Sequence, residues 1–431
     1  MRIKKLAGAL AVVGLATISG AAFATNGYFS HGYGMKAKGM AGAATAVTGD
    51  TFGGANNPAT MVWAGDRLDV GLDWFSPIRA AERAGSTAGL NSSSDSDSNH
   101  FQIPEFGYNK MLNSNLSLGV TVYGNGGMNT NYPDGVLSSA TCGAFPGGTT
   151  TNANMLCGTG RLGVDLSQLI VAPTIAYKIN QNHSIGISPL FGYQRFKAEG
   201  LSAFSSLSSD STNLTNRGYD NAHGWGVRVG YFGQNSDGYS VGVSYATKIN
   251  MSKFDKYKGL FAEQGDFDIP ANFNAGFSGK LTPNLLVAVD FQYIAYSKVN
   301  SVGNPSTNAP SLGSNDGRGF GWDDVRVVKL GLEHKYSNNM TLRGGVSFAN
   351  NPIQGRDVTF NIIAPAVIEN HATLGMTYKF YKTSELTVSY MHAFSNSVSG
   401  ASLFTALGAP GGTEKIEMYQ NSLGVAYGVK F

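Results

Sequence analysis

The sequence predicts an all-β protein, a transmembrane antiparallel β-barrel of about 14 strands whose lumen is plugged by an N-terminal hatch. Three observations support this fold class. The chain begins with an export signal, continues with a stretch too rich in glycine to fold alone, and after Asp66 alternates between strands and turns to its last residue. The glycine-rich stretch needs a container, and a barrel supplies one.

Residues 1–24 are expected to be a signal peptide. A basic start precedes an apolar run from Leu6 to Ile18 and a small-residue cleavage site at Ala22-Phe23-Ala24. The run is short for a membrane-spanning helix, which disfavours a retained anchor. Removing its three basic residues reduces the 31 basic residues to 28, against 28 acidic ones, so the charge balance indicates no nucleic-acid partner.

Residues 25–65 are assigned to the hatch and residues 66–431 to the barrel. Glycine and alanine dominate the hatch, which ends in the turn Asn57-Pro58-Ala59. Because proline fixes φ and removes a hydrogen-bond donor, the chain can leave the lumen there without continuing into a β-ladder.

Beyond Asp66 the chain falls into segments of about ten residues, the length that a tilted strand needs to cross a bilayer. In Tyr239–Ala246, for example, bulky residues alternate with small ones. Short turns alternate with long connections at 124–166 and 300–322, which is typical of outer-membrane barrels. The candidate strands begin near Arg67, Gln102, Leu116, Leu169, His183, His223, Tyr239, Phe267, Leu285, Asp324, Met340, Ile368, Ser384 and Glu414.

The last strand ends on Phe431, with an apolar residue at every second position before it. This pattern resembles the terminal signal that the outer-membrane assembly machinery recognises. We therefore expect that machinery, membrane lipids and lipopolysaccharide as partners, and the outer membrane of a Gram-negative bacterium as the location. The protein is expected to be a monomer.

Cys142 and Cys157 lie in one segment rich in glycine, threonine and asparagine. In an exported chain, a lone close pair of cysteines is most simply a disulfide that closes a short ring. No His, Asp or Glu lies between them, so a metal site is not indicated. No cofactor is expected either.

Several motifs, taken in order, resemble the FadL/TodX family of outer-membrane transporters for long-chain fatty acids and other hydrophobic compounds. These motifs are the leader ending at Asn57-Pro58-Ala59, then Tyr123-Gly124, Tyr193–Lys197, Phe348–Pro352 and Ser389–His392. The resemblance covers essentially the whole mature chain. It implies fourteen strands, a lumen closed by a hatch, and a third strand that bends inward.

Under this resemblance, Gly124, Gly126 and Gly127 form the bend in the third strand. Glycines suit a bend because they offer neither side-chain packing nor a stiff backbone. The bend implies a gap in the barrel wall. Without the resemblance, the same glycines fit the ordinary start of a loop.

Arg195 is the candidate for binding a substrate carboxylate, because the segment around it resembles the place where the family has an interior basic residue. Lys197 is a further candidate, as is either Arg326 or Lys329. A lumen pair between Arg195 and Glu199 is the alternative. Asp323 stands where fatty-acid members have a second basic residue, which favours a neutral hydrocarbon.

Phe145 and Leu156, in the long loops, are predicted apolar contacts that capture substrate, with simple loop packing as the alternative. The functional hypothesis is a channel that takes up hydrophobic compounds through its loops and a lumen pocket and releases them laterally past the bend. A general diffusion porin and a structural or adhesive barrel are the alternatives. Ser389 and His392 are expected on opposite faces of a strand, so an enzyme is not indicated.

Overall fold

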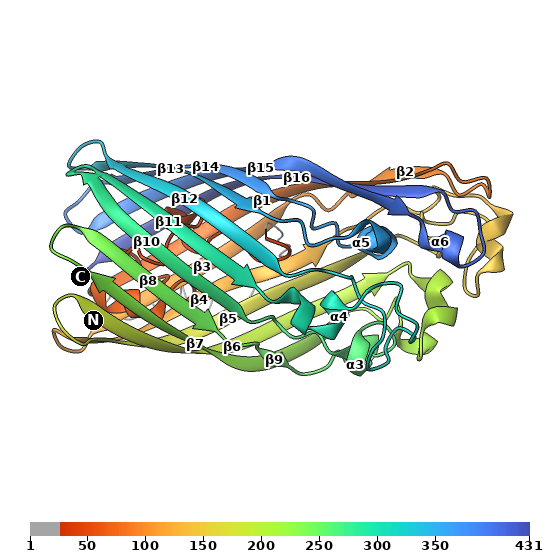
Figure 1. The fold of residues 1–431 in the computed structure, drawn as a ribbon, viewed down its shortest axis with the longest axis horizontal. Coiled ribbons are helices and arrows are strands. Elements are labelled where there is room, and N and C mark those ends of the chain that lie inside the picture. Colours follow the sequence, from red (N-terminus) through yellow and green to blue (C-terminus); the bar gives the residue numbers. More distant parts are fainter. Residues whose placement is uncertain (1–25) are drawn as a thin grey trace, which may run out of the picture.

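The computed structural model describes residues 26–431, so the expected signal peptide at residues 1–24 lies outside the described part of the chain. The described residues form one closed antiparallel β-barrel (Figure 1). Fourteen long strands make the wall, and the last of them pairs with the first. Two further strands, of four and two residues, attach outside this circuit. The predicted fourteen-stranded barrel is confirmed.

The elements keep the labels of Figure 1. The wall strands are β1 (Arg67–Ala84), β3 (Phe101–Met111), β4 (Leu116–Asn129), β5 (Gly163–Lys178), β6 (His183–Glu199), β7 (Asp220–Gln234), β8 (Tyr239–Ala246), β10 (Asn272–Thr282), β11 (Leu285–Ile294), β12 (Val325–Lys335), β13 (Met340–Ala349), β14 (Asn370–Lys379), β15 (Ser384–Ala401) and β16 (Thr413–Lys430). The attached strands are β2 (Ser92–Asp95) and β9 (Asn250–Met251).

All helices in the described part of the chain are short. The α-helices are α2 (Met35–Lys38), α3 (Ala262–Gly265), α4 (Asn300–Gly303), α5 (Val358–Asn361) and α6 (Leu403–Ala406). The 3-10 helices are η1 (Pro58–Trp63), η2 (Ala140–Ala144), η3 (Ser202–Leu207), η4 (Ser211–Asn213), η5 (Asp255–Tyr257), η6 (Tyr296–Lys298) and η7 (Gly355–Asp357). None of these helices is long and apolar enough to cross a membrane.

Twelve of the fourteen strands begin within three residues of the predicted positions. β5 begins at Gly163 rather than near Leu169, because its first residues pair with the far end of β6 without showing a clear apolar alternation. β10 begins at Asn272 rather than near Phe267. Pro270 intervenes there, and a proline cannot donate to a ladder.

The strands place charged side chains in the lumen and apolar ones on the outer surface. In β1, Asp69 and Asp73 are buried inside the barrel, whereas Val70, Leu72 and Trp74 alternate with them and are exposed on the outside. In a soluble sandwich the charged face points to water, but in a bilayer the apolar face points to lipid. The observed orientation is the one that a membrane barrel requires.

The two ends of the barrel differ. Tight turns such as 179–182, 336–339 and 380–383 join the strands at the left end of Figure 1. At the right end, long connections carry α3, α4, α5 and α6. We call these the turn end and the loop end.

Residues 26–65, here called the inner segment, lie within the barrel and touch its wall on many sides. Its carbonyl and side-chain atoms approach wall glycines closely: a Cβ on Gly230 would lie 2.0 Å from Asn57 Oδ1, and one on Gly242 would lie 2.0 Å from the Thr45 carbonyl oxygen. These wall positions therefore require glycine, which leaves room for the inner segment. The wall glycines and the inner segment are therefore packed directly against each other.

Candidate functional site

Charged bonds fasten the middle of the inner segment to the wall. Lys38 Nζ lies 2.7 Å from Asp73 Oδ2, and both side chains are buried. Asp290 Oδ2 accepts hydrogen bonds from the backbone nitrogens of Ala44, at 2.9 Å, and Thr45, at 2.8 Å. Hydrogen bonds to a buried carboxylate are among the stronger contacts available in a protein.

Further wall carboxylates hold neighbouring parts of the inner segment. Asp69 accepts from the Thr51 hydroxyl at 2.8 Å, and Glu105 accepts from the Gly34 backbone nitrogen at 3.2 Å. Although burial disfavours its charge, the Asp73 and Glu105 carboxylates raise the pKa of Lys38 above its ordinary value. The alternation of the strands predicted that charged side chains face the lumen. It did not show with which atoms of the inner segment they form hydrogen bonds.

The turn Asn57-Pro58-Ala59 opens η1 and anchors the end of the inner segment. Asn57 caps this helix, since its Oδ1 accepts from the Ala59 backbone nitrogen at 3.1 Å, and Pro58 occupies the first position. The Asn57 side-chain nitrogen also donates to the carbonyl oxygens of Thr45 and Tyr231, each at 2.9 Å. The turn therefore ties the inner segment to itself and to β7.

An aromatic cluster surrounds the beginning of the inner segment in the loop-end half of the barrel. The rings of Tyr28 and Tyr296 have centroids 5.0 Å apart, and those of Tyr296 and Trp322 are 5.2 Å apart, both with edge-on geometry. The Tyr296 hydroxyl accepts from the Tyr28 and Phe29 nitrogens and donates to the Asn26 carbonyl oxygen at 2.6 Å. Two residues far away in the sequence, Tyr296 and Trp322, thus hold the start of the inner segment.

An apolar cavity of about 30 Å³ lies among the loops beyond this cluster. Arg318 is the one charged residue of its lining, and its Nε is buried without a hydrogen-bond partner in the described part of the chain. The lining residues are Leu156, Leu201, Phe204, Leu214, Leu260, Phe261, Ser301, Leu312, Arg318, Gly319, Phe320, Phe360 and Ile363. Such a site favours an apolar ligand.

Aromatic side chains connect this apolar cavity to the inner segment. Phe261 lines the cavity, and its ring centroid lies 4.7 Å from that of Phe267. Phe267 in turn lies 6.1 Å from Tyr28. A parallel connection runs from Phe320 to Trp322, at 6.1 Å. The apolar surface is therefore continuous from the loops into the lumen.

The barrel wall is interrupted beside this path. β4 pairs with β3 only as far as Val122, opposite Phe106. Among the wall strands, residues 123–129 of β4 pair only with β5. The register against β5 shifts between Gly124 and Gly126, which marks a bulge. The third wall strand therefore departs from its neighbour at the glycines singled out in the sequence.

The inner segment occupies the place that β3 leaves open along β4. Phe29 forms a β-bridge with Gly126, the Gly127 nitrogen donates to the Tyr28 carbonyl oxygen at 3.2 Å, and the Ser30 nitrogen donates to the Asn125 carbonyl oxygen at 3.2 Å. A Cβ on Gly126 would lie 2.0 Å from the Tyr28 oxygen, so this close approach requires glycine. The start of the inner segment thus covers the interruption.

The loop residues chosen from the sequence lie at the loop end. Cys142 and Cys157 form a disulfide. Leu156 lines the apolar cavity, whereas Phe145 packs on Phe404, with ring centroids 4.9 Å apart, and does not line it. Phe404 stacks on the cavity residue Phe204, so Phe145 lies two rings away from the cavity.

The expectation that Arg195 is an interior residue is wrong, and Lys197 lies on the same outer face of the strand. On β6 they follow the same alternation as Tyr193, which is exposed on the outer surface, while Phe196 between them is buried inside. The Arg195 guanidinium lies 3.4 Å from the ring centroid of Tyr219. Lys197 Nζ pairs with Glu199 at 3.0 Å.

Arg326 also faces outward, because it alternates with the buried Val325 and Val327 on β12. Three residues further on, Lys329 faces the lumen and donates to the His31 carbonyl oxygen at 3.1 Å. Motif resemblance located these segments but could not fix which residue of an alternating pair turns inward.

Ser389 and His392 face opposite sides of β15, as the alternation predicts. The Ser389 hydroxyl contacts the Met35 sulfur at 3.2 Å, and His392 Nδ1 bonds Asn421 Oδ1 at 2.9 Å. Across residues 26–431, no group of three His, Cys, Asp or Glu side chains is arranged to hold a metal ion.

A closed apolar-surfaced barrel, a polar lumen occupied by its own N-terminal segment and an apolar cavity at the loop end define a class, the plugged outer-membrane channels. The sequence profile described as "Outer membrane protein transport protein (OMPP1/FadL/TodX)" matches residues 11–430. The chain therefore belongs to the FadL/TodX family, and it is an outer-membrane protein.

Solved structures agree on the fold. The toluene transporter TodX of Pseudomonas putida is 18% identical, with a TM-score of 0.69 over 93% of this chain and 99% of that one. A FadL homologue of Pseudomonas aeruginosa is 14% identical, with a TM-score of 0.67 over 94% and 100%. The toluene transporter TbuX of Ralstonia pickettii is 17% identical, with a TM-score of 0.62 over 93% and 99%. No curated protein sequence matches the chain.

Proposed function

We propose that this protein is a channel that takes hydrophobic small molecules from outside the cell and releases them into the outer membrane. One observation carries the proposal: an apolar path leads from the loop cavity to the interruption between β3 and β4. Release into lipid is driven by partitioning, at roughly 0.8 kcal/mol for each CH₂ removed from water. Neither a cofactor nor a catalytic group has a role in this mechanism.

The inner segment acts as the hatch in this proposal. Its residues 28–30 bond to the bent part of β4 and cover the interruption. A ligand arriving along Phe261 and Phe267 meets Tyr28 first, so displacement of that ring couples binding to hatch movement. The open, water-filled lumen of a general porin is not supported, since the inner segment occupies the barrel.

The substrate has an apolar body. At about 30 Å³ the cavity holds little more than a water molecule, so the loops must move apart to admit a substrate. The solved relatives named as toluene transporters support neutral aromatic compounds. Arg318 offers a place for one carboxylate, which supports long-chain fatty acids as the second candidate class.

Equilibrium binding to detergent-purified mature protein tests the substrate class. We expect Phe261→Ala to weaken the binding of both toluene and a long-chain fatty acid, and Arg318→Gln to weaken only the fatty acid. Phe277→Ala, at an exposed position on the outer surface, is the matched control and should change neither. If the unaltered protein bound neither compound, the proposed function would be rejected.

A reversible cross-link tests the hatch. A Cβ on Gly39 would lie 3.5 Å from the Arg343 Cβ, within the range of a disulfide, so Gly39→Cys with Arg343→Cys should tie α2 to β13. We expect uptake of substrate into proteoliposomes to stop in the oxidised double variant and to return on reduction. The Arg343→Cys variant alone, treated identically, controls for the lost arginine and for the native disulfide. Undiminished uptake by the locked protein would exclude movement of the hatch at Gly39 as a step in transport.

The surroundings of the channel follow from the same proposal. We propose that the protein is a monomer in contact with membrane lipids and lipopolysaccharide, and that the assembly machinery recognises the strand ending at Phe431. The Phe431 ring stacks on Tyr108 at 5.9 Å, at the turn end of the outer surface. Replacing Phe431 with a polar residue should reduce the amount of folded protein in outer membranes, measured by heat-modifiable electrophoretic mobility.

A further inference from the structure

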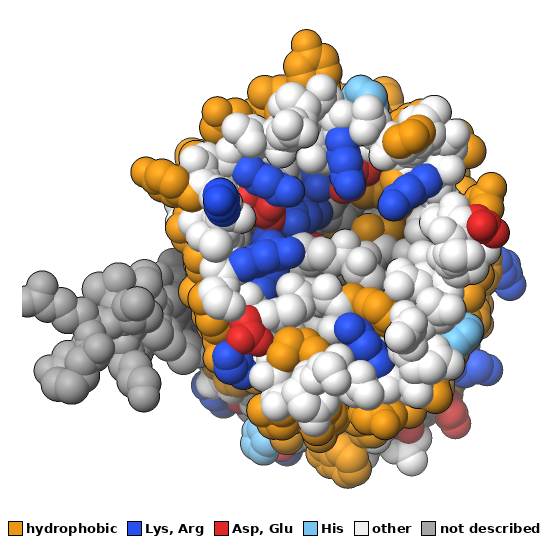
Figure 2. Space-filling model, turned by 90° about the vertical axis from the view of Figure 1, so that its left-hand side faces the viewer, with side chains coloured by type: hydrophobic (Ala, Val, Ile, Leu, Met, Phe, Trp, Pro, Cys, Tyr) orange, Lys and Arg blue, Asp and Glu red, His pale blue; other side chains and the backbone are white. Residues whose placement is uncertain are grey.

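A second cavity, of about 310 Å³, opens at the turn end of the barrel. Figure 2 views this end and shows Lys and Arg side chains gathered around a hollow. The inner segment lines one side, through α2 and residues 47–50, and the ends of β12 to β16 and β1 line the other. We call it the basic cavity, because seven of its lining residues are basic and three are acidic.

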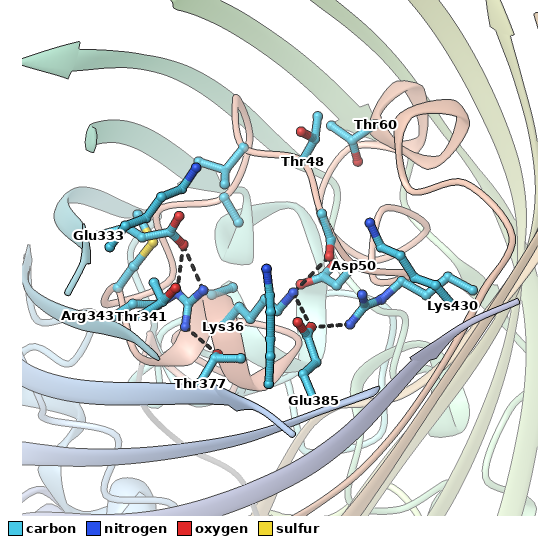
Figure 3. Close-up of a pocket in the computed structure, with 18 of the residues that line it drawn as sticks. Lys36, Thr48, Asp50, Thr60, Glu333, Thr341, Arg343, Thr377, Glu385 and Lys430 are labelled. Carbon is cyan, nitrogen blue, oxygen red and sulfur yellow. Dashed lines mark hydrogen bonds and ion pairs between the residues drawn. The ribbon is translucent and has the colours of Figure 1, made fainter. Parts of the chain in front are cut away.

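The inner three cations of the basic cavity already have carboxylate partners (Figure 3). Arg343 Nη2 lies 2.7 Å from Glu333, and Lys36 Nζ lies 2.6 Å from Glu385, which also pairs with Arg67. These pairs join the inner segment and the wall. They account for two of the three acidic lining residues, Asp50 being the third.

The remaining four cations form an outer rim of lysines. Lys335, Lys379 and Lys430 are the last residues of β12, β14 and β16, and Lys382 lies in the turn after β14. Within residues 26–431, the ammonium groups of these four lysines have no hydrogen-bond or ion-pair partner. The rim therefore presents positive charge that the protein itself does not balance.

Unbalanced like charges around a concave surface repel one another and focus a positive potential into the hollow. The repulsion falls when an anion binds between them. Lysine ammonium groups bind phosphate and carboxylate oxygens as point charges on flexible stems, so they can close around anions of different shape. A cavity of about 310 Å³ lies within the size range of small-molecule sites.

We propose that the basic cavity binds a small anion carrying phosphate or carboxylate groups, held by the lysine rim against the inner segment. Thr48 of the inner segment lies on its floor, so a bound anion contacts both the inner segment and the wall. Asp50 also lines the cavity and, within the described part of the chain, is the one lining carboxylate without an ion pair, so it opposes the anion while the four lysines attract it. Binding that requires both parts in place stabilises their association. The site is separate from the apolar path, and its existence does not depend on the identity of the transported compound.

Calorimetric titration of the detergent-purified mature protein tests the site, with pyrophosphate as a soluble anion and a short-chain phosphatidylglycerol as a lipid headgroup. We expect saturable binding of at least one of them, weakened by salt and reduced about tenfold or more in the triple variant Lys379→Gln, Lys382→Gln, Lys430→Gln. The ligand that binds more tightly shows whether the natural anion is a soluble molecule or a lipid headgroup. The matched control replaces the exposed loop-end lysines Lys253, Lys256 and Lys258 with Gln and should bind as the unaltered protein does.

A second measurement reports on the floor of the basic cavity. Both native cysteines are in the disulfide, so Thr48→Cys introduces the one free thiol among the described residues. Saturating pyrophosphate or phosphatidylglycerol should slow maleimide labelling of this thiol and leave that of Ser93→Cys, at the loop end, unchanged.

The proposal is overturned if neither anion binds saturably, or if the rim variant and the loop-end control lose binding equally, since general charge would then explain it. It is also overturned if labelling of Thr48→Cys is insensitive to saturating anion. Heat-modifiable mobility of each variant establishes that the barrel is folded before it is titrated. Failure of the hydrocarbon-binding test would leave this result standing, because the two sites share no lining residue.

Discussion

The two halves of the lumen are held together by different forces. Towards the turn end, the inner segment meets the wall through buried charges, such as Lys38 with Asp73 and the amides of residues 44–45 with Asp290. Towards the loop end, the same segment meets aromatic rings, chiefly Tyr296 and, through Tyr28, Trp322. Charged hydrogen bonds demand fixed geometry, whereas aromatic packing tolerates displacement by another apolar group. We therefore expect the loop-end part of the hatch to yield first and the turn-end part to move only once its charged bonds break.

The largest effect is expected from breaking a charged anchor. Asp73→Ala leaves Lys38 buried without its nearest carboxylate, which should weaken the seating of the inner segment by about 4 kcal/mol. Hydrogen exchange of the amides in residues 34–45 should rise and should be restored in the double variant Lys38→Met, Asp73→Leu. Unchanged exchange in Asp73→Ala would show that charge does not hold this half.

A somewhat smaller effect is expected in the aromatic half. Trp322→Ala removes a ring that is 1% exposed and should loosen the start of the inner segment by about 3 kcal/mol. Exchange should rise at residues 26–30 but not at residues 34–45. Trp225→Ala, on the outer surface, is the control. A rise in both regions would mean that the two halves move as one unit.

The helix cap at the end of the inner segment should contribute less to the free energy that holds this segment in the barrel. Asn57→Ala removes the side chain that caps η1 and bonds to Thr45 and Tyr231, at a cost of about 1 kcal/mol. Asn57→Ser keeps a capping oxygen but loses the two donated bonds, and should fall between the alanine variant and the unaltered protein. Equal effects of both changes on exchange in residues 57–63 would assign the whole contribution to the donated bonds.

The smallest effect on the binding of the inner segment is expected from a change of pH, which acts through His31, a residue between the two halves. Burial, with the positive charges of Lys38 and Lys329 and the neighbouring His371, lowers the pKa of His31 well below its ordinary value. Below about pH 6.5 a released inner segment takes up a proton that the seated one does not, so acid weakens seating. Exchange of residues 30–34, corrected for its intrinsic pH dependence, should rise below that pH and stay flat in His31→Gln.

The sequence by itself determined the architecture. Alternation in segments such as Tyr239–Ala246 gives a strand whose two faces differ, and the number and length of such segments fit a membrane barrel. Gly124, Gly126 and Gly127 predicted the bend of β4 only together with the family resemblance, since from the residues alone they fit the start of a loop. The alternation of the strands, in contrast, follows from local chemistry.

Only the tertiary structure decided which residues face the lumen and which partners they meet. Arg195 and Phe196 are adjacent, and a shift of one residue in the motif match exchanges outside for inside. The Tyr296 hydroxyl and residue 28 lie 268 positions apart, and three of the four rim lysines come from the ends of separate strands. Closure of the barrel brings such residues together. No local pattern in the sequence says which distant residues then become neighbours, because that depends on the register of all the strands.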